Sequence, residues 1–175
     1  MRLVVAVTGA SGVELGLKLV AKLPESVTGY LILSENARRV LEHESHRVYD
    51  NDDIAAPVAS GSFPSDAMIV VPCSMNTLAK IACGIADNLV TRTAAVMLKE
   101  GRPLLLAPRE MPFGTIALEN MLKLSRLGVT IAPPVPGYYS GHATVEEMED
   151  FMIGKWFDLL GIGHTLYKRW RIEEL

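Results

Sequence analysis

Small hydroxyl, amide and charged residues follow four of the apolar runs in this chain, at the points where those runs end. They are the segment TGASG at 8–12, Ser34, the group Ser74, Asn76 and Thr77, and the pair Arg109 and Glu110. Glycines let a ligand approach the backbone closely, and amides at a helix start suit a phosphate. An arginine can reach a phosphate or the polar edge of a ring. These residue types together indicate a bound cofactor.

Simpler interpretations of the same residues remain open. Ser34 and Ser74 each stand where a helix can begin, so each side chain can act as an N-cap and nothing more. A dinucleotide site is disfavoured, because the glycines of 8–12 are not spaced as GxGxxG and Ser34 replaces the acidic residue expected after the second strand. Hydroxyl residues at three separate strand ends favour a cofactor site over capping alone.

The elements that must position these residues alternate along the chain. Continuous apolar runs predict buried strands at 3–7, 30–34, 68–72, 102–108 and 129–133. Helical periodicity predicts helices over 12–23, 35–44, 115–128 and 144–161, with two more across 74–99. Buried strands separated by helices predict an α/β fold with a parallel sheet covered on both faces. Such sheets bind ligands outside the carboxyl ends of their strands, which is where the four groups of residues fall.

Length and composition favour a single globular domain over 1–175. Of the 175 residues 49% are hydrophobic, and this apolar excess suggests a buried subunit interface. A net charge of −3 with scattered Lys and Arg disfavours a nucleic-acid partner. No apolar run reaches about 18 residues, and no cleavage-site pattern is present, so we expect a cytoplasmic protein that does not bind a membrane. The spacing of the cysteines and histidines predicts no metal site.

Several segments together resemble the UbiX-type flavin prenyltransferases over almost the whole chain. The segments are TGASG, SENARRVLEHES, ASGSF, MIVVPCSMNTLAKIACG, NLVTRTAAVMLKEGRPLLLAPREMPF, LENMLKLSRLG and PPVPGYY. The resemblance implies a three-layer Rossmann-like, flavodoxin-like fold and a large homo-oligomer, usually a dodecamer. It implies transfer of a dimethylallyl group from dimethylallyl monophosphate to N5 and C6 of reduced FMN, without a metal. The product would be the prenylated FMN used by UbiD-type decarboxylases.

The resemblance also implies roles for particular residues. The residues matching FMN-binding positions are Gly9, Ala10, Ser11, Ser34, Ser74, Met75, Asn76, Thr77 and Arg109. Those matching or lying near the prenyl-donor site are Arg92, Lys99, Tyr139, Lys155 and Trp170. Those expected to act in catalysis are Glu44, Ser11 and Glu110. Fixed cations would stabilise the charge that develops as phosphate departs, and a desolvated carboxyl can serve as acid and base.

At three of these positions the residue type or its sequence context limits what the resemblance implies. Lys155 stands where many members have arginine, which keeps the charge but loses the bidentate fork. Taken without the resemblance, Glu44 is a solvated charge beside Glu42 on a helix. Trp170 can cover a neighbouring subunit's site, or it can simply anchor the tail. The segment between Glu44 and Asp53 is also shorter than in longer members.

Two alternative functions come from different classes. The run SMNTLAKIACGIADNL is close to a loop of FMN-dependent cysteine decarboxylases, but PREMPF stands where that group has a PAMN-like segment. The other alternative is a non-catalytic FMN-binding subunit of a decarboxylase. That subunit would be expected to lack the set Glu44, Lys99, Arg109 and Tyr139, and all four residues are present.

Overall fold

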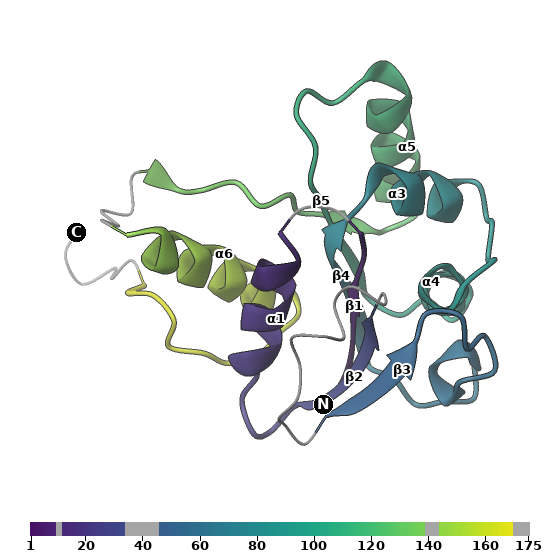
Figure 1. Cartoon of the computed structure of the whole chain (residues 1–175), viewed down its shortest axis with the longest axis horizontal. Helices are drawn as coiled ribbons and strands as arrows, with labels where there is room; N and C mark the ends of the chain where they lie inside the picture. Colours follow the sequence, from purple (N-terminus) through teal and green to yellow (C-terminus); the bar gives the residue numbers. More distant parts are fainter. Residues whose placement is uncertain (10–11, 34–45, 139–143, 170–175) are drawn as a thin grey trace. The chain divides into compact units, whose positions relative to one another are not determined.

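Six parallel strands form one sheet in the computed structural model of this chain (Figure 1). The strands are β1 (Arg2–Val7), β2 (Thr28–Leu33), β3 (Arg47–Asp50), β4 (Ala67–Cys73), β5 (Leu104–Pro108) and β6 (Thr130–Ile131). Their order is β3-β2-β1-β4-β5-β6, which is that of a doubly wound Rossmann fold. In the middle of the sheet Val5 lies between Leu31 and Ile69. The predicted parallel α/β fold is confirmed.

The structure describes residues 1–9, 12–33, 46–138 and 144–169. The sheet belongs to the first of two compact units, Met1–Pro133, and the second is Pro134–Leu175. The helical elements of the described residues are α1 (Val13–Ala21), η1 (Pro57–Ala59), α3 (Met75–Ala82), α4 (Leu89–Lys99), α5 (Thr115–Arg126) and α6 (Val145–Leu159).

Polar side chains determine where three of the helices begin. Ser74 caps α3, and Asn88 forms a reciprocal capping box with Thr91 at the start of α4. Thr144 and Glu147 form the same box at the start of α6. Each cap satisfies amides that have no partner inside the helix, so these residues set the helix boundaries.

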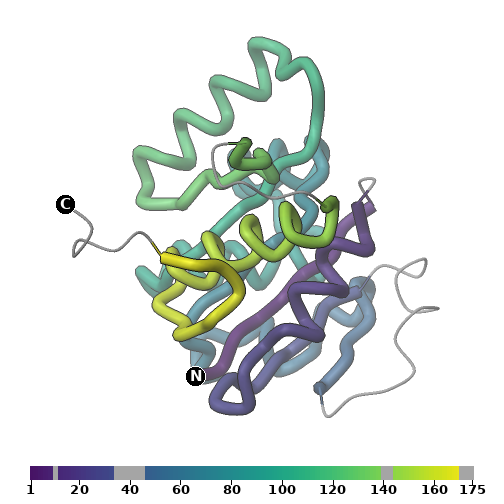
Figure 2. Tube along the Cα trace, turned by 90° about the vertical axis from the view of Figure 1, so that its left-hand side faces the viewer, coloured from purple at the N-terminus to yellow at the C-terminus, as the bar shows by residue number. Residues whose placement is uncertain are grey.

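Helices cover both faces of the sheet in the first unit. Val4 of β1 packs in a core cluster with Leu78 of α3 and Leu124 of α5. Val7 points to the other face, where α1 is so close that a Cβ added to Gly16 would lie 3.0 Å from a Val7 methyl. Figure 1 shows α1 on one side of β1 and β4, with α3 and α4 on the other. In Figure 2 the segment between β5 and β6 extends above the sheet and carries α5.

Each predicted strand has a counterpart in the sheet, but β3 was not predicted. Its sequence, RVYD, has two exposed and two half-buried residues and lies at the edge of the sheet. A short edge strand of this kind has no continuous apolar run, which was the signal used for the other strands. The helix predicted over 35–44 lies outside the described residues.

The second unit contains α6 and the segment that follows it. Gly154 allows a close approach, since a Cβ there would lie 2.6 Å from the Tyr167 ring and 2.7 Å from His164. Asp158 accepts hydrogen bonds from the Tyr167 hydroxyl and from the Arg169 guanidinium, the latter at 2.6 Å. These contacts hold the segment up to Arg169 against α6. None of the helices in the described ranges is long and apolar enough to cross a membrane.

Candidate cofactor site

The carboxyl ends of β1 and β4 are neighbours at the centre of the sheet, where the strand order reverses. From β1 the chain proceeds outward through β2 and β3, and from β4 it proceeds the opposite way through β5 and β6. Open parallel sheets bind ligands at such a switch point. Gly9 follows β1 and Ser74 follows β4, so the structure brings these two predicted cofactor residues to this position.

The buried side chain of Thr8 joins the two turns. Its Oγ1 donates to the carbonyl oxygen of Pro72 at 2.8 Å and accepts from the backbone N–H of Ser74 at 3.0 Å. Thr8 is only 7% exposed, so water competes little for these bonds. The hydroxyl therefore fixes the end of β1, directly before Gly9, against the turn that begins at Ser74.

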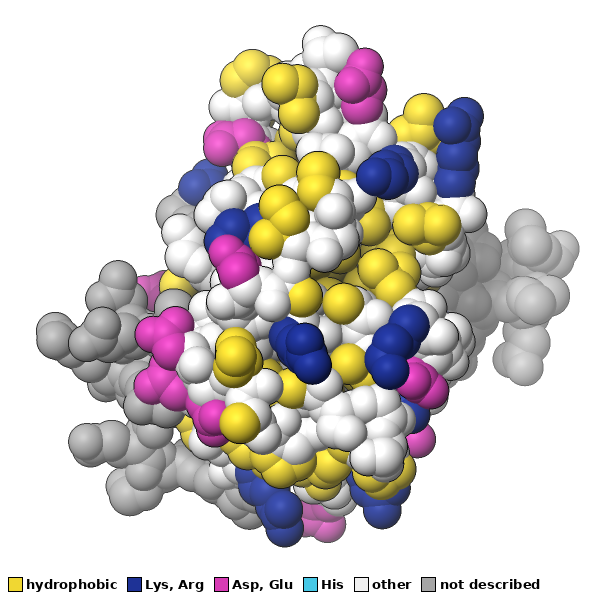
Figure 3. Space-filling model, turned by 90° about the vertical axis from the view of Figure 1, so that its right-hand side faces the viewer, with side chains coloured by type: hydrophobic (Ala, Val, Ile, Leu, Met, Phe, Trp, Pro, Cys, Tyr) yellow, Lys and Arg dark blue, Asp and Glu magenta, His cyan; other side chains and the backbone are white. Residues whose placement is uncertain are grey.

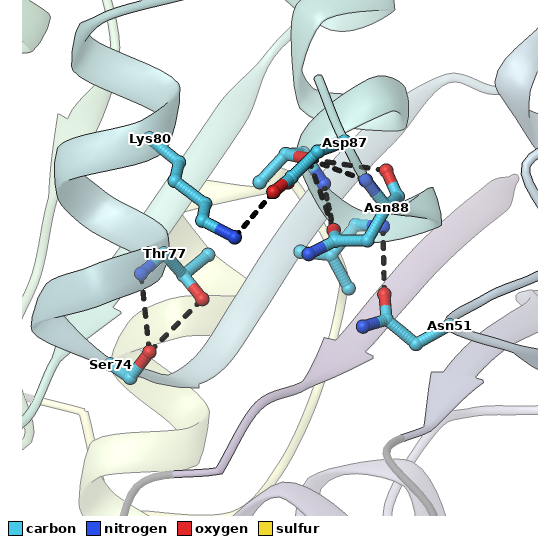
Figure 4. Close-up of polar contacts among 8 residues, drawn as sticks. Asn51, Ser74, Thr77, Lys80, Asp87 and Asn88 are labelled. Carbon is cyan, nitrogen blue, oxygen red and sulfur yellow. Dashed lines mark hydrogen bonds and ion pairs between the residues drawn. The ribbon is translucent and has the colours of Figure 1, made fainter. Parts of the chain in front are cut away.

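Ser74 does act as the N-cap of α3, so the capping interpretation is confirmed for this residue. Its Oγ accepts from the Thr77 N–H at 3.2 Å and donates to Thr77 Oγ1 at 3.0 Å (Figure 4). Thr77 keeps its own hydroxyl proton for a ligand. The amides of Met75 and Asn76 have no hydrogen-bond partner among the described residues. Capping therefore leaves donors at this turn unused, and capping and ligand binding are compatible.

The start of α4, in contrast, is closed to a ligand. Asn88 Oδ1 accepts from the Thr91 N–H at 2.9 Å. The backbone oxygen of Asn51 accepts from the Leu89 N–H at 2.7 Å. The Oδ1 of Asn51 accepts from the Val90 N–H at 3.1 Å (Figure 4). Protein groups thus satisfy the first three amides of α4. The amides available to an anion at this edge of the sheet are therefore those at the start of α3, or at the start of α1, which begins at Gly12 without a side-chain cap.

Two cations on α3 and α4 differ in their availability to a ligand. Lys80 forms an ion pair with Asp87 at 2.6 Å, and its hydrogen bond lowers the pKa of that carboxyl (Figure 4). Arg92, in the first turn of α4, is exposed and has no ion pair within the described ranges. Of these two cations, Arg92 is the one free to contact a phosphate.

The end of β5 brings a third group to the same edge. The Arg109 N–H donates to the Cys73 carbonyl oxygen at 3.2 Å, which ties β5 to β4. The side chains of Arg109 and Glu110 are exposed, and Glu110 Oε1 accepts from the Met111 N–H at 3.0 Å. Burial raises the pKa of the Cys73 thiol to about 12, so Cys73 is not a nucleophile near neutral pH. The charge that this strand end offers to a ligand is that of Arg109.

Lys99 lies at the opposite edge of the sheet. It ends α4, which runs back from the carboxyl edge to the start of β5, and it pairs with Glu100 at 3.0 Å. Nearby, Arg102 donates to the carbonyl oxygens of Phe63 at 2.7 Å and Gly61 at 2.8 Å. The length of a strand separates the two edges by about 20 Å. Within one chain, Lys99 therefore does not join the carboxyl-edge group.

The remaining predicted residues fall into two groups. Ala10, Ser11, Ser34, Glu44, Tyr139 and Trp170 lie outside the described residues. Lys155 is an exposed residue of α6 and belongs to the second compact unit.

The sequence places Thr8 in the candidate segment 8–12 but gives its side chain no role, and Asn51 is not among the expected site residues. The sequence does contain a signal for the start of α4, because Asn88 and Thr91 have the spacing of a capping box. The bonds of Thr8 to Pro72 and Ser74 carry no such local signal, since they join segments 64 and 66 residues apart. They follow from β1 and β4 being neighbours in the sheet.

The donors at this edge fit a ligand with a phosphate and a polar ring. The free amides of Met75 and Asn76 suit an anionic or carbonyl oxygen, and Arg109 supplies an exposed positive charge. The described residues contain no group of three or more His, Cys, Asp and Glu that could hold a metal ion. FMN carries a phosphate and carbonyl oxygens on its ring, and the residues present suit it.

Known proteins match this chain over nearly its full length. A model of the Flavoprotein family matches residues 1–155. The flavin prenyltransferase UbiX of Helicobacter pylori (strain ATCC 700392 / 26695) is 45% identical over 184 aligned positions, which cover 97% of this chain and 98% of that protein. The chain belongs to the Flavoprotein family and, within it, to the UbiX-type flavin prenyltransferases.

Two solved structures are similar to the whole chain. A dodecameric FMN-dependent UbiX-like decarboxylase from Escherichia coli O157:H7 superposes with a TM-score of 0.90 at 43% identity, covering 98% of this chain and all of that one. AnUbiX (PadA1), solved in complex with FMN and dimethylallyl pyrophosphate, superposes with a TM-score of 0.89 at 43% identity, covering 97% of each chain. These matches extend the family assignment from sequence to fold.

Proposed function

We propose that this protein is a flavin prenyltransferase that joins a dimethylallyl group to reduced FMN. The C–O bond between the dimethylallyl carbon and phosphate breaks, and phosphate departs. The freed allylic carbon bonds to flavin N5, which loses its proton. The adjacent alkene carbon then takes up a proton, the tertiary carbon bonds to flavin C6, and the C6 proton is lost on ring closure. The observation that carries the proposal is the set of free donors at the β1–β4 switch point, in a chain 45% identical to a flavin prenyltransferase.

The flavin would lie at the carboxyl edge of the sheet. We assign its binding to Gly9, Ala10, Ser11, Ser34, Ser74, Met75, Asn76, Thr77 and Arg109. The support comes from the described members of this set: Thr8 joins the strand end at Gly9 to the turn at Ser74, and the Arg109 N–H bonds the Cys73 carbonyl oxygen next to that turn. Ser74 contributes mainly by positioning, because its hydroxyl already caps α3, whereas Thr77 can still donate its proton.

The prenyl donor would be held by cations that stabilise the departing phosphate. We assign this role to the cations Arg92, Lys99 and Lys155, with the Tyr139 hydroxyl as a further hydrogen-bond donor and Trp170 covering the site. Fixed positive charges stabilise developing negative charge without reorganising, so the reaction needs no metal. We assign the proton transfers to Glu44, Ser11 and Glu110.

A homo-oligomer follows from two features of the first unit. Ile116, Leu118 and Leu122 of α5 are 75%, 52% and 53% exposed, which leaves α5 with an apolar surface. Figure 3 shows hydrophobic side chains gathered on the upper part of the molecule, where α5 lies. Lys99 lies at the far edge of its own sheet, so if it holds the donor's phosphate, it does so in another subunit's site. We therefore propose an assembly of identical subunits, as in the dodecameric relative.

The same proposal covers the domain, the location and the recipient of the product. We propose that residues 1–175 form one flavoprotein domain, which is supported by a family match that extends into both compact units. The protein would act in the cytoplasm and supply prenylated FMN to a UbiD-type decarboxylase.

Release of inorganic phosphate tests the proposed reaction and its donor. Under anaerobic conditions we expect the protein to release phosphate from dimethylallyl monophosphate only when reduced FMN is present, and to do so equally with EDTA. Release of pyrophosphate from dimethylallyl pyrophosphate at a higher rate would instead identify the diphosphate as donor. Phosphate release that does not require flavin would indicate a phosphatase and contradict the proposal.

A further inference from the structure

We infer that Thr8 is a positioning residue that couples the two cofactor-binding turns across the switch point of the sheet. The inference rests on the proposed binding of FMN at these turns. Thr8 directly precedes Gly9, and its hydroxyl contacts the backbone on both sides of Cys73, at Pro72 and at Ser74. One side chain thus ties the end of β1, where Gly9 follows, to the turn that begins at Ser74.

The bonds of Thr8 begin where the strand pairing ends. The pairing of β1 with β4 runs from Leu3–Ala67 to Ala6–Val70. Beyond it, Thr8 Oγ1 provides bonds of 2.8 and 3.0 Å, and the Thr8 N–H adds a longer one of 3.4 Å to the Pro72 oxygen. Loss of the hydroxyl would therefore leave the sheet paired but release the turns.

The hydrogen bonds continue from Thr8 to the free donors of α3. Thr8 holds the Ser74 backbone, and Ser74 Oγ holds Thr77. The free amides of Met75 and Asn76 lie between these two anchors. A shift of Ser74 would therefore move the donors assigned to the flavin, even if every strand stayed in place.

A valine at position 8 would have nearly the same volume but no acceptor for the Ser74 N–H. Thr8 is only 7% exposed, so water could not readily replace the lost hydroxyl as a partner of the Ser74 N–H. A serine would restore both the donor and the acceptor. The pair Thr8→Val and Thr8→Ser therefore separates the role of the hydroxyl from that of the methyl group.

The test measures the Kd for FMN of wild type and of variants by flavin fluorescence, well below the thermal midpoint of each apoprotein. We expect Thr8→Val to bind FMN about tenfold more weakly, which corresponds to the usual free-energy cost of one buried polar group left without a hydrogen-bond partner. We expect Thr8→Ser to recover most of the affinity. The matched control is Thr93→Val, since Thr93 is fully buried and its Oγ1 has no partner within the described ranges. This control should bind FMN like wild type.

The outcomes separate the inference from the proposed function. Wild-type protein that fails to bind FMN would contradict the proposed function itself. If wild type binds FMN and Thr8→Val binds equally well, or binds weakly without recovery in Thr8→Ser, the positioning role is wrong. A lower thermal midpoint with an unchanged Kd would show that Thr8 supports only the fold. Thr8→Ala replaces Thr8→Val in the same comparison if the valine variant does not fold.

Discussion

At the scale of single residues, Asp158 shows how one carboxylate can organise a segment of the second unit. His164 Nε2 lies 3.1 Å from its Oδ1, Arg169 donates to Oδ1 at 2.6 Å, and the Tyr167 hydroxyl donates to Oδ2. Partial burial opposes ionisation, but the hydrogen bonds from Arg169, Tyr167 and His164 prevail and lower the pKa of Asp158 to about 2. The ionised carboxylate is therefore the form that holds the segment.

We expect Asp158→Asn to lower the free energy of unfolding by about 1–3 kcal/mol at pH 7, because it weakens several charge-assisted hydrogen bonds. The pKa of Asp158 is lower in the folded state than in the unfolded state. The extra stability of wild type is therefore fully present above the unfolded pKa of about 4 and is lost as the pH falls toward about 2.

Urea unfolding at a series of pH values between 2 and 7 would measure this difference. Asp52→Asn, at an exposed aspartate, is the control and should change stability little at any of these pH values. A difference between wild type and Asp158→Asn that stays constant down to pH 2 would contradict the assigned role of the carboxylate.

At the scale of elements, close packing of α1 on the sheet fixes the switch point from one face. A Cβ on Gly16 would overlap the Val71 carbonyl oxygen and lie 3.0 Å from a Val7 methyl. Glycine at this position therefore lets α1 approach β1 and β4 next to the turns that Thr8 joins. The need for glycine at this position arises from the contact between α1 and the sheet, and neither element requires it alone.

We expect Gly16→Ala to destabilise the protein by about 1–3 kcal/mol, the usual cost of overpacking a close contact that backbone atoms help to form. Gly163→Ala is the matched control, because a Cβ at Gly163 would meet nothing within 4 Å. Urea unfolding of both variants measures the effect. Equal stability of Gly16→Ala and wild type would show that α1 can move away from the strands without cost.

The elements also show which features the sequence can predict. Continuous apolar runs identified β1, β2, β4 and β5 because a parallel strand buried on both faces must be apolar throughout. The same signal cannot identify β3, whose RVYD sequence is half exposed. The contacts of Thr8 depend on the order of strands, which no local pattern encodes.

Lys99 lies farther from Arg109 in the structure than the sequence-based assignment of the site expects. The family resemblance places Lys99 near the prenyl-donor site and Arg109 at the FMN site, and these two sites must be adjacent for the transfer to occur. The chain between them crosses the sheet, with α4 ending at one edge and β5 ending at the other. The alternation of helix and strand accounts for this separation, because a helix between two parallel strands runs back across the sheet.

At the scale of the whole molecule, the separation of Lys99 from Arg109 has a consequence for assembly. If both residues serve one reaction, each active site must combine groups from two subunits. The exposed apolar residues of α5 provide a surface for contacts between subunits. Assembly would then complete the site as well as stabilise the chain.

We expect Lys99→Ala and Arg109→Ala each to reduce prenyl transfer strongly, and co-assembled mixtures of the two variants to regain part of the activity. A mixed oligomer can contain sites with Arg109 from one subunit and Lys99 from another. Activity of co-expressed and separately purified variants measures this complementation, and mixtures of assembled single variants serve as the control. Co-expressed variants as inactive as the separate ones would contradict a shared site.

The mass of the flavin after turnover tests the central claim most directly. The protein is incubated anaerobically with reduced FMN and dimethylallyl monophosphate, and the extracted flavin is analysed by mass spectrometry. We predict a flavin that is heavier than FMN by one C5 unit. Recovery of unmodified FMN alone, from protein that binds FMN and with both the monophosphate and the pyrophosphate donor supplied, would contradict the assignment as a flavin prenyltransferase.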